Sequence, residues 1–242
     1  MGISTLVVVR NLPEPTCFDQ KQNQGEFGVD CGGPCSPCEL QRPKPVTVFW
    51  AKAVPVRENV YDVAALIQNQ NEVLSSAEVE YEFILSGEFG EAARRRGRTF
   101  LLAQERTMLI EVNIPASHAA DRVEFRIIAV EWQFRKDQKP NVLAERREYR
   151  VTEEFGKKQS VVEASIVNGT ALDLNEVTVQ IGIFDEEGNI VGVNRIVIEH
   201  VRAGSRRTVR AIWPKEFQGK PASIEMETRV NMFDPEVIVK PR

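Results

Sequence analysis

The two halves of this 242-residue chain share one apolar pattern, repeated at an almost constant offset of about one hundred residues. That spacing matches the size of an immunoglobulin-like or fibronectin-like β-sandwich. The repeat therefore predicts an all-β fold with two tandem sandwiches. The matched positions of the first copy are Ala65, Ile67, Asn69, Glu78, Val79, Tyr81, Phe83, Leu85, Ala103, Arg106 and Leu109, and those of the second are Ala164, Ile166, Asn168, Glu176, Val177, Val179, Ile181, Ile183, Ala203, Arg206 and Val209.

Alternating apolar residues support strands in both copies. A period of two is typical of a strand with one face on a core and the other in water. Between Ile127 and Ile128 the apolar phase slips, which predicts a β-bulge. The clearest alternating runs are Val79, Tyr81, Phe83 and Leu85, and then Ile224, Met226, Thr228 and Val230 against the water-facing Glu225, Glu227 and Arg229.

Composition divides the chain into three parts. Residues 10–46 are rich in Pro, Gly, Asn, Gln and Asp and lack a periodic apolar pattern. Within them, residues 39–46 contain two prolines and are expected to form an extended connector. We therefore predict a cysteine-rich segment with a proline connector at 1–46, a first sandwich at 47–150 and a second at 151–242, joined near 148–158.

All four cysteines of the chain, Cys17, Cys31, Cys35 and Cys38, lie in this first segment. So short a segment cannot bury a core, so it needs cross-links or a metal. An even count fits two disulfides, with three possible pairings. The alternative is a zinc site formed by four thiolates, although Cys17 stands far from the close-spaced others. Disulfides indicate an extracellular protein, whereas zinc would indicate an intracellular adaptor.

The segment also resembles a small cysteine motif of bacterial surface proteins. The residues that carry the likeness are Cys17, Asp19, Asn23, Glu26, Gly28, Asp30, Cys31, Gly32, Gly33, Cys35 and Cys38. It departs from the motif at Gln20, where glycine is common. In that family the motif typically follows a membrane-spanning or lipoprotein leader and precedes β-sandwich domains. The resemblance covers about a tenth of the chain and implies an exported, oxidised segment.

Oxygen donors within the motif raise the hypothesis of a calcium site. Asp19, Asn23, Glu26 and Asp30 are hard ligands, and the nearby glycines permit tight turns. Their spacing is not that of the twelve-residue calcium loop. A loop without a core is also polar and glycine-rich for structural reasons, and Asp and Asn form turns with their own backbone. The structural explanation is the favoured one.

The second copy resembles the FxLYD family of bacterial surface modules. Ile181, Ile183, Phe184 and Asp185 fill the strand-end motif conservatively, and Gly188 supplies the following turn. In the first copy Phe83 and Leu85 fit, but Ser86 and Gly87 replace the aromatic and the aspartate. The resemblance implies a sandwich in the cell envelope and carries no known active site.

Overall composition is that of an ordinary globular protein, with a formal net charge of -4 that gives no indication of nucleic-acid binding. No stretch reaches the eighteen apolar residues of a membrane span. Residues 1–10 do not resemble a secretory signal, which conflicts with the disulfide interpretation. Either a leader has been replaced or the cysteines bind metal in the cytosol. We favour the first, so any membrane attachment would depend on a leader outside this sequence.

One dense charge run consists of Arg94, Arg95, Arg96 and Arg98. It is a candidate site for an anionic polymer or lipid headgroup, and its structural alternative is a solvated hairpin loop. Catalytic motifs are missing from the sequence: His118 and His200 have no nucleophile–base pattern around them. A hydrolase is therefore the least favoured class.

These observations predict a non-enzymatic protein of the cell envelope or extracellular space, with a structural or adhesive role and a protein or envelope-polymer partner. No cofactor is expected, apart from calcium in the motif or zinc in the intracellular alternative. The sequence does not specify the oligomeric state.

Overall fold

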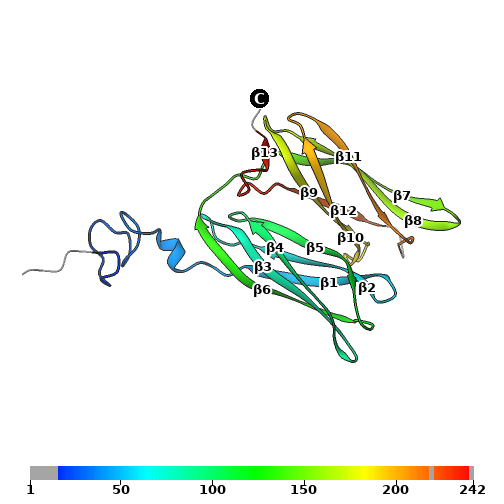
Figure 1. The fold of residues 1–242 in the computed structure, drawn as a ribbon, viewed down its shortest axis with the longest axis horizontal. Helices are drawn as coiled ribbons and strands as arrows, with labels where there is room; N and C mark the ends of the chain where they lie inside the picture. Colours follow the sequence, from blue (N-terminus) through cyan, green and yellow to red (C-terminus); the bar gives the residue numbers. More distant parts are fainter. Residues whose placement is uncertain (1–15, 218–220, 240–242) are drawn as a thin grey trace, which may run out of the picture. The chain divides into compact units, whose positions relative to one another are not determined.

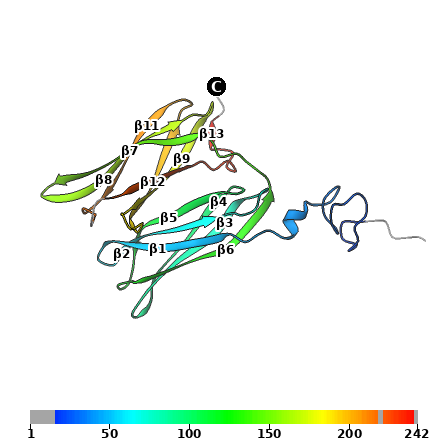
Figure 2. The same cartoon turned by 180° about the vertical axis from the view of Figure 1, so that it is seen from behind.

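The computed structural model describes residues 16–217 and 221–239, and residues 1–15, including the start of the chain analysed above, lie outside them. These residues are nearly all β, with thirteen strands and the 3-10 helix η1 (Cys38–Gln41) (Figures 1 and 2). Among the described residues, those from 16 to Pro43 form one compact unit, and those from Lys44 onward form another. No helix in the described part is long and apolar enough to cross a membrane.

The first sandwich consists of two three-stranded antiparallel sheets, in the orders β1-β2-β5 and β4-β3-β6. Its core lies between them and includes Val63, Ile67, Phe83 and Leu85, all fully buried. The predicted alternation of β3 is thereby confirmed. The strands are β1 (Thr47–Arg57), β2 (Val60–Gln68), β3 (Leu74–Gly87), β4 (Gly90–Leu101), β5 (Arg106–Pro115) and β6 (Arg122–Phe134).

The second sandwich repeats this plan with the sheets β11-β8-β7 and β10-β9-β12, and β13 also pairs with β9. Its core includes Ile166, Ile181 and Ile183, which are fully buried, and Trp213, which is 4% exposed. The strands are β7 (Val142–Glu154), β8 (Lys157–Asn168), β9 (Asp173–Phe184), β10 (Ile190–Val201), β11 (Arg206–Trp213), β12 (Ser223–Arg229) and β13 (Ile238–Val239).

A matched asparagine fixes the same loop in each copy. Asn69 directly follows β2 and Asn168 ends β8, and both are fully buried. Asn69 Nδ2 donates to the carbonyls of Leu74 and Leu102. Asn168 Nδ2 donates to three carbonyls on the equivalent loops, those of Leu172, Val201 and Arg202. The repeat seen in the sequence therefore corresponds to a repeat of hydrogen bonding.

The structure confirms the predicted bulge but differs from the sequence-based expectations for the connector and the sandwich boundary. Tyr81 on β3 pairs with Ile127 and Glu80 pairs with Ala129, so Ile128 is the extra residue of a bulge, as predicted. Residues 39–41 belong to η1 and are not extended, because Leu40 closes a turn onto the Pro37 carbonyl and both connector prolines come after the helix. Residue 150, the proposed sandwich boundary, lies inside β7, where Arg150 pairs with Val161.

The outer faces of two sheets, one from each sandwich, pack against each other. Ala64, Met108 and Ile110 of the β1-β2-β5 sheet form a buried cluster with Val193 of β10. Gly182 of β9 lies against Met108 so closely that a Cβ there would be 2.8 Å from the methionine Cε. The contact is apolar and close-packed, so the two sandwiches are joined by one continuous interface.

This interface corrects the prediction for β12. Arg229, expected to face water, is only 5% exposed, because the outer face of its sheet is covered by the first sandwich. Its guanidinium pairs with Glu105, donates to the Phe100 carbonyl and Thr99 Oγ1, and stacks over the Phe100 ring. Glu227 on the same face accepts a hydrogen bond from Thr107 of β5.

The loop-fixing role of Asn168 predicts a large cost on truncation. Asn168→Ala leaves the carbonyls of Leu172 and Val201 without their donor, and we expect about 2–3 kcal/mol of lost stability by chemical denaturation, since each buried unpaired group is costly. Asn194→Ala on β10 is the matched control, because no side-chain hydrogen bond of Asn194 is formed within the described residues; it should change stability by less than about 0.5 kcal/mol. Equal losses in the two variants would contradict the role.

Candidate functional site

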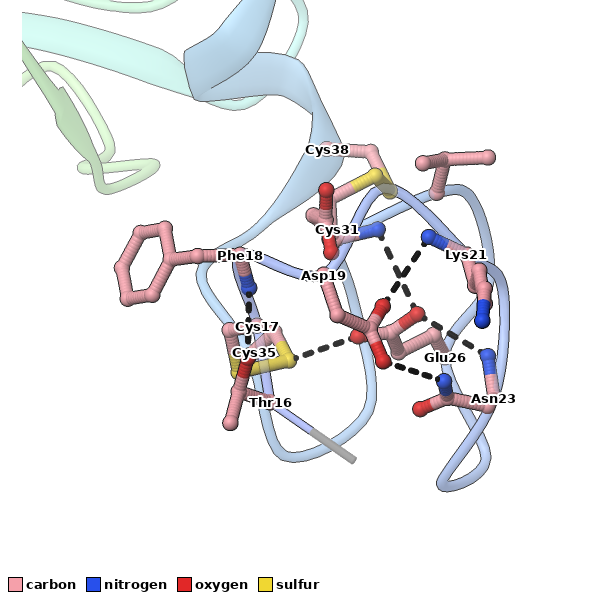
Figure 3. The surroundings of a disulfide bond; sticks show 12 residues. Thr16, Cys17, Phe18, Asp19, Lys21, Asn23, Glu26, Cys31, Cys35 and Cys38 are labelled. Carbon is pink, nitrogen blue, oxygen red and sulfur yellow. Dashed lines mark hydrogen bonds between the residues drawn. A yellow bond between two sulfur atoms is a disulfide. The ribbon is translucent and has the colours of Figure 1, made fainter. Parts of the chain in front are cut away.

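Two disulfides hold the cysteine-rich unit together, and they interleave along the chain. Cys17 bonds to Cys35 and Cys31 bonds to Cys38 (Figure 3). This selects one of the three possible pairings and leaves no free cysteine. The sulfur atoms are therefore not available as four zinc-binding thiolates. Each closed loop restricts the unfolded chain, by roughly 3 kcal/mol for a loop near fifteen residues, in a unit with little apolar core.

Glu26 organises the loop between the disulfides. Its side chain is 6% exposed, and Oε2 accepts hydrogen bonds from the backbone N–H groups of Asn23 and Asp30. Its Oε1 lies 3.0 Å from Cys35 Sγ. A disulfide sulfur has no hydrogen to donate, so this is a close contact only. The same carboxylate and the Cys17–Cys35 sulfurs gather in one place, but their S–S bond argues against a metal site there.

The proposed calcium ligands are only partly brought together. Figure 3 shows the side chains of Asp19, Asn23 and Glu26 next to one another. Asp19 accepts from Asn23 Nδ2 and from the Lys21 N–H, and the first of these contacts holds its pKa below the ordinary value. Both Asp30 oxygens instead accept from the Gln20 N–H. These carboxylates close turns, as the structural explanation requires, and calcium binding stays a prediction.

The arginine run lies on strand β4 and not in the expected hairpin loop. Cross-strand charge pairing stabilises this strand, because β4 runs beside the glutamates of β3. Each arginine of the run contacts a carboxylate. The pairs are Arg94 with Glu82 and Glu91, Arg95 with Glu111, Arg96 with Glu82, and Arg98 with Glu78 and Glu80. Anion binding by this run stays a prediction, since each of its arginines already contacts a carboxylate.

Glu82 is the centre of this charged network. Burial alone would raise its pKa, but hydrogen bonds from Arg94 and Arg96 outweigh that effect and keep the pKa low. Glu91 and Glu124 also have lowered pKa values, owing first to hydrogen bonds from Arg94 and Arg126. Glu82, Glu91 and Glu124 are therefore ionised near neutral pH.

Neither histidine lies beside a carboxylate in a way that would suggest a hydrolytic site. His118 Nδ1 is 2.9 Å from the Oγ of the adjacent Ser117, and its ring packs edge-on against Phe89. His200 is exposed near the end of β10 and has a positive φ. Among the described residues, no acidic group forms an ion pair or hydrogen bond with either ring.

The residues where the sandwiches meet, chiefly Arg229, Glu105 and Gln180, are not predicted from the sequence. Each lies on or next to a strand at a position that alternation assigns to solvent. The sequence signal is limited to polar residues within or beside alternating strands, and that signal does not identify a partner 124 residues away in the chain.

Comparisons with known proteins place the chain in no family. No family model matches it, and no curated protein matches it. Among solved structures, the crystal structure of red sea bream transglutaminase is similar over 78% of this chain and 30% of that chain, at 12% identity and a TM-score of 0.27. The chain thus spans less than a third of that protein's length, and a likeness so distant supports no argument about function.

The position of Glu26 predicts that its carboxylate protects two backbone amides from hydrogen exchange. Glu26→Ala leaves the Asn23 and Asp30 N–H groups without an acceptor, so we expect their amide exchange to accelerate roughly tenfold, equivalent to about 1.4 kcal/mol of local stability. Glu39→Ala on the exposed side of η1 is the control and should leave both rates unchanged. Unchanged rates in Glu26→Ala would contradict the role, as measured by NMR hydrogen exchange.

The charged network predicts stability that falls in acid. A carboxyl group whose pKa is lower in the folded state than its unfolded value of 4.5 stabilises the folded protein at pH values above 4.5. That stabilisation is lost as the pH falls through the folded-state pKa. We expect the thermal midpoint, followed by circular dichroism, to stay level near neutral pH and to drop below about pH 4.5. Burial raises the pKa of Asp62, which acts in the opposite direction.

One variant distinguishes the contribution of this charged network to acid sensitivity from that of other carboxylates. Arg94→Met removes the hydrogen bonds that lower the pKa values of Glu82 and Glu91, so its midpoint should fall less steeply in acid. Arg210→Met, on an exposed position of β11, should retain the wild-type slope. The same acid slope in wild type and Arg94→Met would show that the network does not govern the transition.

Proposed function

We propose that this chain is a non-enzymatic extracellular protein whose tandem sandwiches serve a structural or adhesive role. The observation that carries the proposal is the pairing of all four cysteines in two disulfides within one short unit. Such bonds persist in oxidising compartments and are rare in the cytosol. A β-sandwich fold of moderate size with a disulfide-bonded leading unit fits that setting.

An adhesive or scaffolding role is supported by the rigid pairing of the sandwiches. Two sandwiches joined by an apolar interface and a buried ion pair hold their outer surfaces at a fixed spacing. Open sheet edges such as β4 and β6 offer backbone groups for strand addition by a protein partner. An envelope polymer is the other class of partner that we propose. We also propose that the protein is attached to a membrane through a leader.

Family resemblance contributes to the envelope proposal. Strand β9 ends at Phe184, Asp185 Oδ1 then accepts from the Glu187 and Asn189 N–H groups, and Gly188 has a φ of 80°. This arrangement resembles the strand end and glycine turn of the FxLYD pattern. Together with the cysteine motif, it supports a bacterial surface module as the proposed class.

The intracellular zinc adaptor is the competing function, and one experiment separates the two. Intact mass is measured after alkylation of the purified chain, with and without reductant, following exposure to a chelator. We expect no alkylation until reductant is added, and then addition at all four cysteines. Alkylation without reductant would overturn the extracellular proposal and favour a metal-binding role.

The location itself is tested in the source organism. Intact cells are treated with a protease that cannot cross the membrane, and the chain is then followed by immunoblot alongside a cytosolic control protein. We expect this chain to be degraded while the control survives. Survival of both proteins in intact cells, with degradation of both after lysis, would contradict surface exposure.

A further inference from the structure

A polar cavity of about 260 Å³ lies between the two sandwiches. Its floor is the outer face of the β10-β9-β12 sheet, represented by Arg195, Thr178 and Gln180. The opposite wall includes Tyr81 of β3 and Thr99 of β4. Its volume falls just below the range of roughly 300–1,000 Å³ usual for drug-sized ligands, so it suits a smaller molecule. Nothing in the proposed structural or adhesive role uses this cavity.

Gln180 gives the cavity a buried polar group without a partner. The residue is 3% exposed, and its Oε1 has no hydrogen-bond partner among the described residues. Its Nε2 also makes no hydrogen bond within them. Buried amides are nearly always paired, and leaving one unpaired is costly. A side chain in this state at a cavity wall is suited to a ligand that supplies the missing bonds.

Arg195 provides an accessible cation beside that amide. Gln180 and Arg195 are paired directly across β9 and β10, so their side chains leave the same face of the sheet about 4.5–5.5 Å apart at Cβ. Within the described part of the chain Arg195 forms no ion pair, and its charge acts on the Tyr81 hydroxyl. Arg229, which also lines the cavity but is buried, is already engaged by Glu105 and the Phe100 carbonyl.

Tyr81 contributes a neutral hydroxyl to the same space. Burial, and then the charge of Glu111, raise its pKa, so the phenol keeps its proton. That proton is donated to Glu111 Oε1 at 2.8 Å. The phenol oxygen still has free lone pairs and can accept a hydrogen bond. The cavity therefore combines one free cation, one free amide and hydroxyl groups that can accept or donate.

We propose that this cavity binds a single hydroxylated carboxylate of sugar size, of the uronic-acid class. The carboxylate accepts two N–H groups from the Arg195 guanidinium, the geometry for which arginine is suited. A hydroxyl next to that carboxylate donates to Gln180 Oε1, and further ring hydroxyls reach Thr178 and Tyr81. Because Arg195 and Gln180 occupy paired positions on one face of the sheet, a single ligand with its hydroxyl and carboxylate on neighbouring carbons can contact both.

One acidic residue at the far end of the cavity adds selectivity. Glu176 lies four residues from Gln180 on the same strand, a distance of roughly 13 Å at 3.3 Å per residue. A ligand with its charge at that end would meet a like charge. A second carboxylate is therefore disfavoured, and a monoanionic sugar is preferred over a polyanion.

The test is a titration of the intact chain with D-glucuronate and D-galacturonate, followed by calorimetry and ligand-observed NMR. Neutral D-glucose lacks the carboxylate, and acetate lacks the hydroxyls. We expect saturable binding of a uronate at about 1 mM or tighter, and binding of both controls at least tenfold weaker. Equal binding of uronate and glucose, equal binding of uronate and acetate, or no saturable uronate binding would each overturn the proposal.

Variants locate the binding in this cavity. Arg195→Ala, at an exposed position, should fold normally and weaken uronate binding at least tenfold. Gln180→Leu should weaken binding while leaving the thermal midpoint unchanged or higher, because an unpaired buried amide is removed. Arg210→Ala on the other sheet of the second sandwich should bind like wild type. Wild-type affinity in Arg195→Ala would overturn the assignment, whatever the outcome of the alkylation test.

Discussion

Packing between the outer faces of the β1-β2-β5 and β10-β9-β12 sheets is the contact on which the arrangement of the sandwiches depends. Each sandwich already has its own core, so this contact is an additional layer. The apolar cluster of Ala64, Met108, Ile110 and Val193 excludes water, and Gly182 permits close approach because a side chain there would meet Met108. Apolar area removed from water stabilises the contact in proportion to that area.

The buried ion pair beside this cluster has a different role. Arg229 and Glu105 lose hydration when they are covered, and such a pair often contributes little net stability compared with apolar residues of similar size. Once the interface has formed, however, removing one partner leaves an unpaired buried charge. The hydrogen bonds to Thr99 and to the Phe100 carbonyl also require one particular alignment of the strands. The pair therefore favours a unique docking geometry over looser alternatives.

Charge is handled differently on the opposite side of the first sandwich. Four arginines on β4 would repel one another, but glutamates of β3 pair with three of them and Glu111 of β5 pairs with Arg95. The cysteine-rich unit is stabilised in a different way. It has few apolar residues to bury, and two interleaved disulfides with the buried Glu26 carboxylate take the place of a core.

The sequence by itself determined the class of fold, the two copies and the strands that form each core. The core-facing positions of a strand can be predicted from nearby residues, because alternation such as Val79, Tyr81, Phe83 and Leu85 involves only a short stretch of chain. The bulge at Ile128 is likewise visible as a local shift in the apolar pattern. It also located the disulfide-bonded segment, although not the pairing, because three connectivities satisfy the same spacing. The tertiary structure alone decided which polar residues are covered. Arg229 and Gln180 occupy positions that alternation assigns to water, and they are buried only because a sheet from the other sandwich covers them. Burial of an outer sheet face depends on contacts between residues far apart in the chain, which no local pattern records.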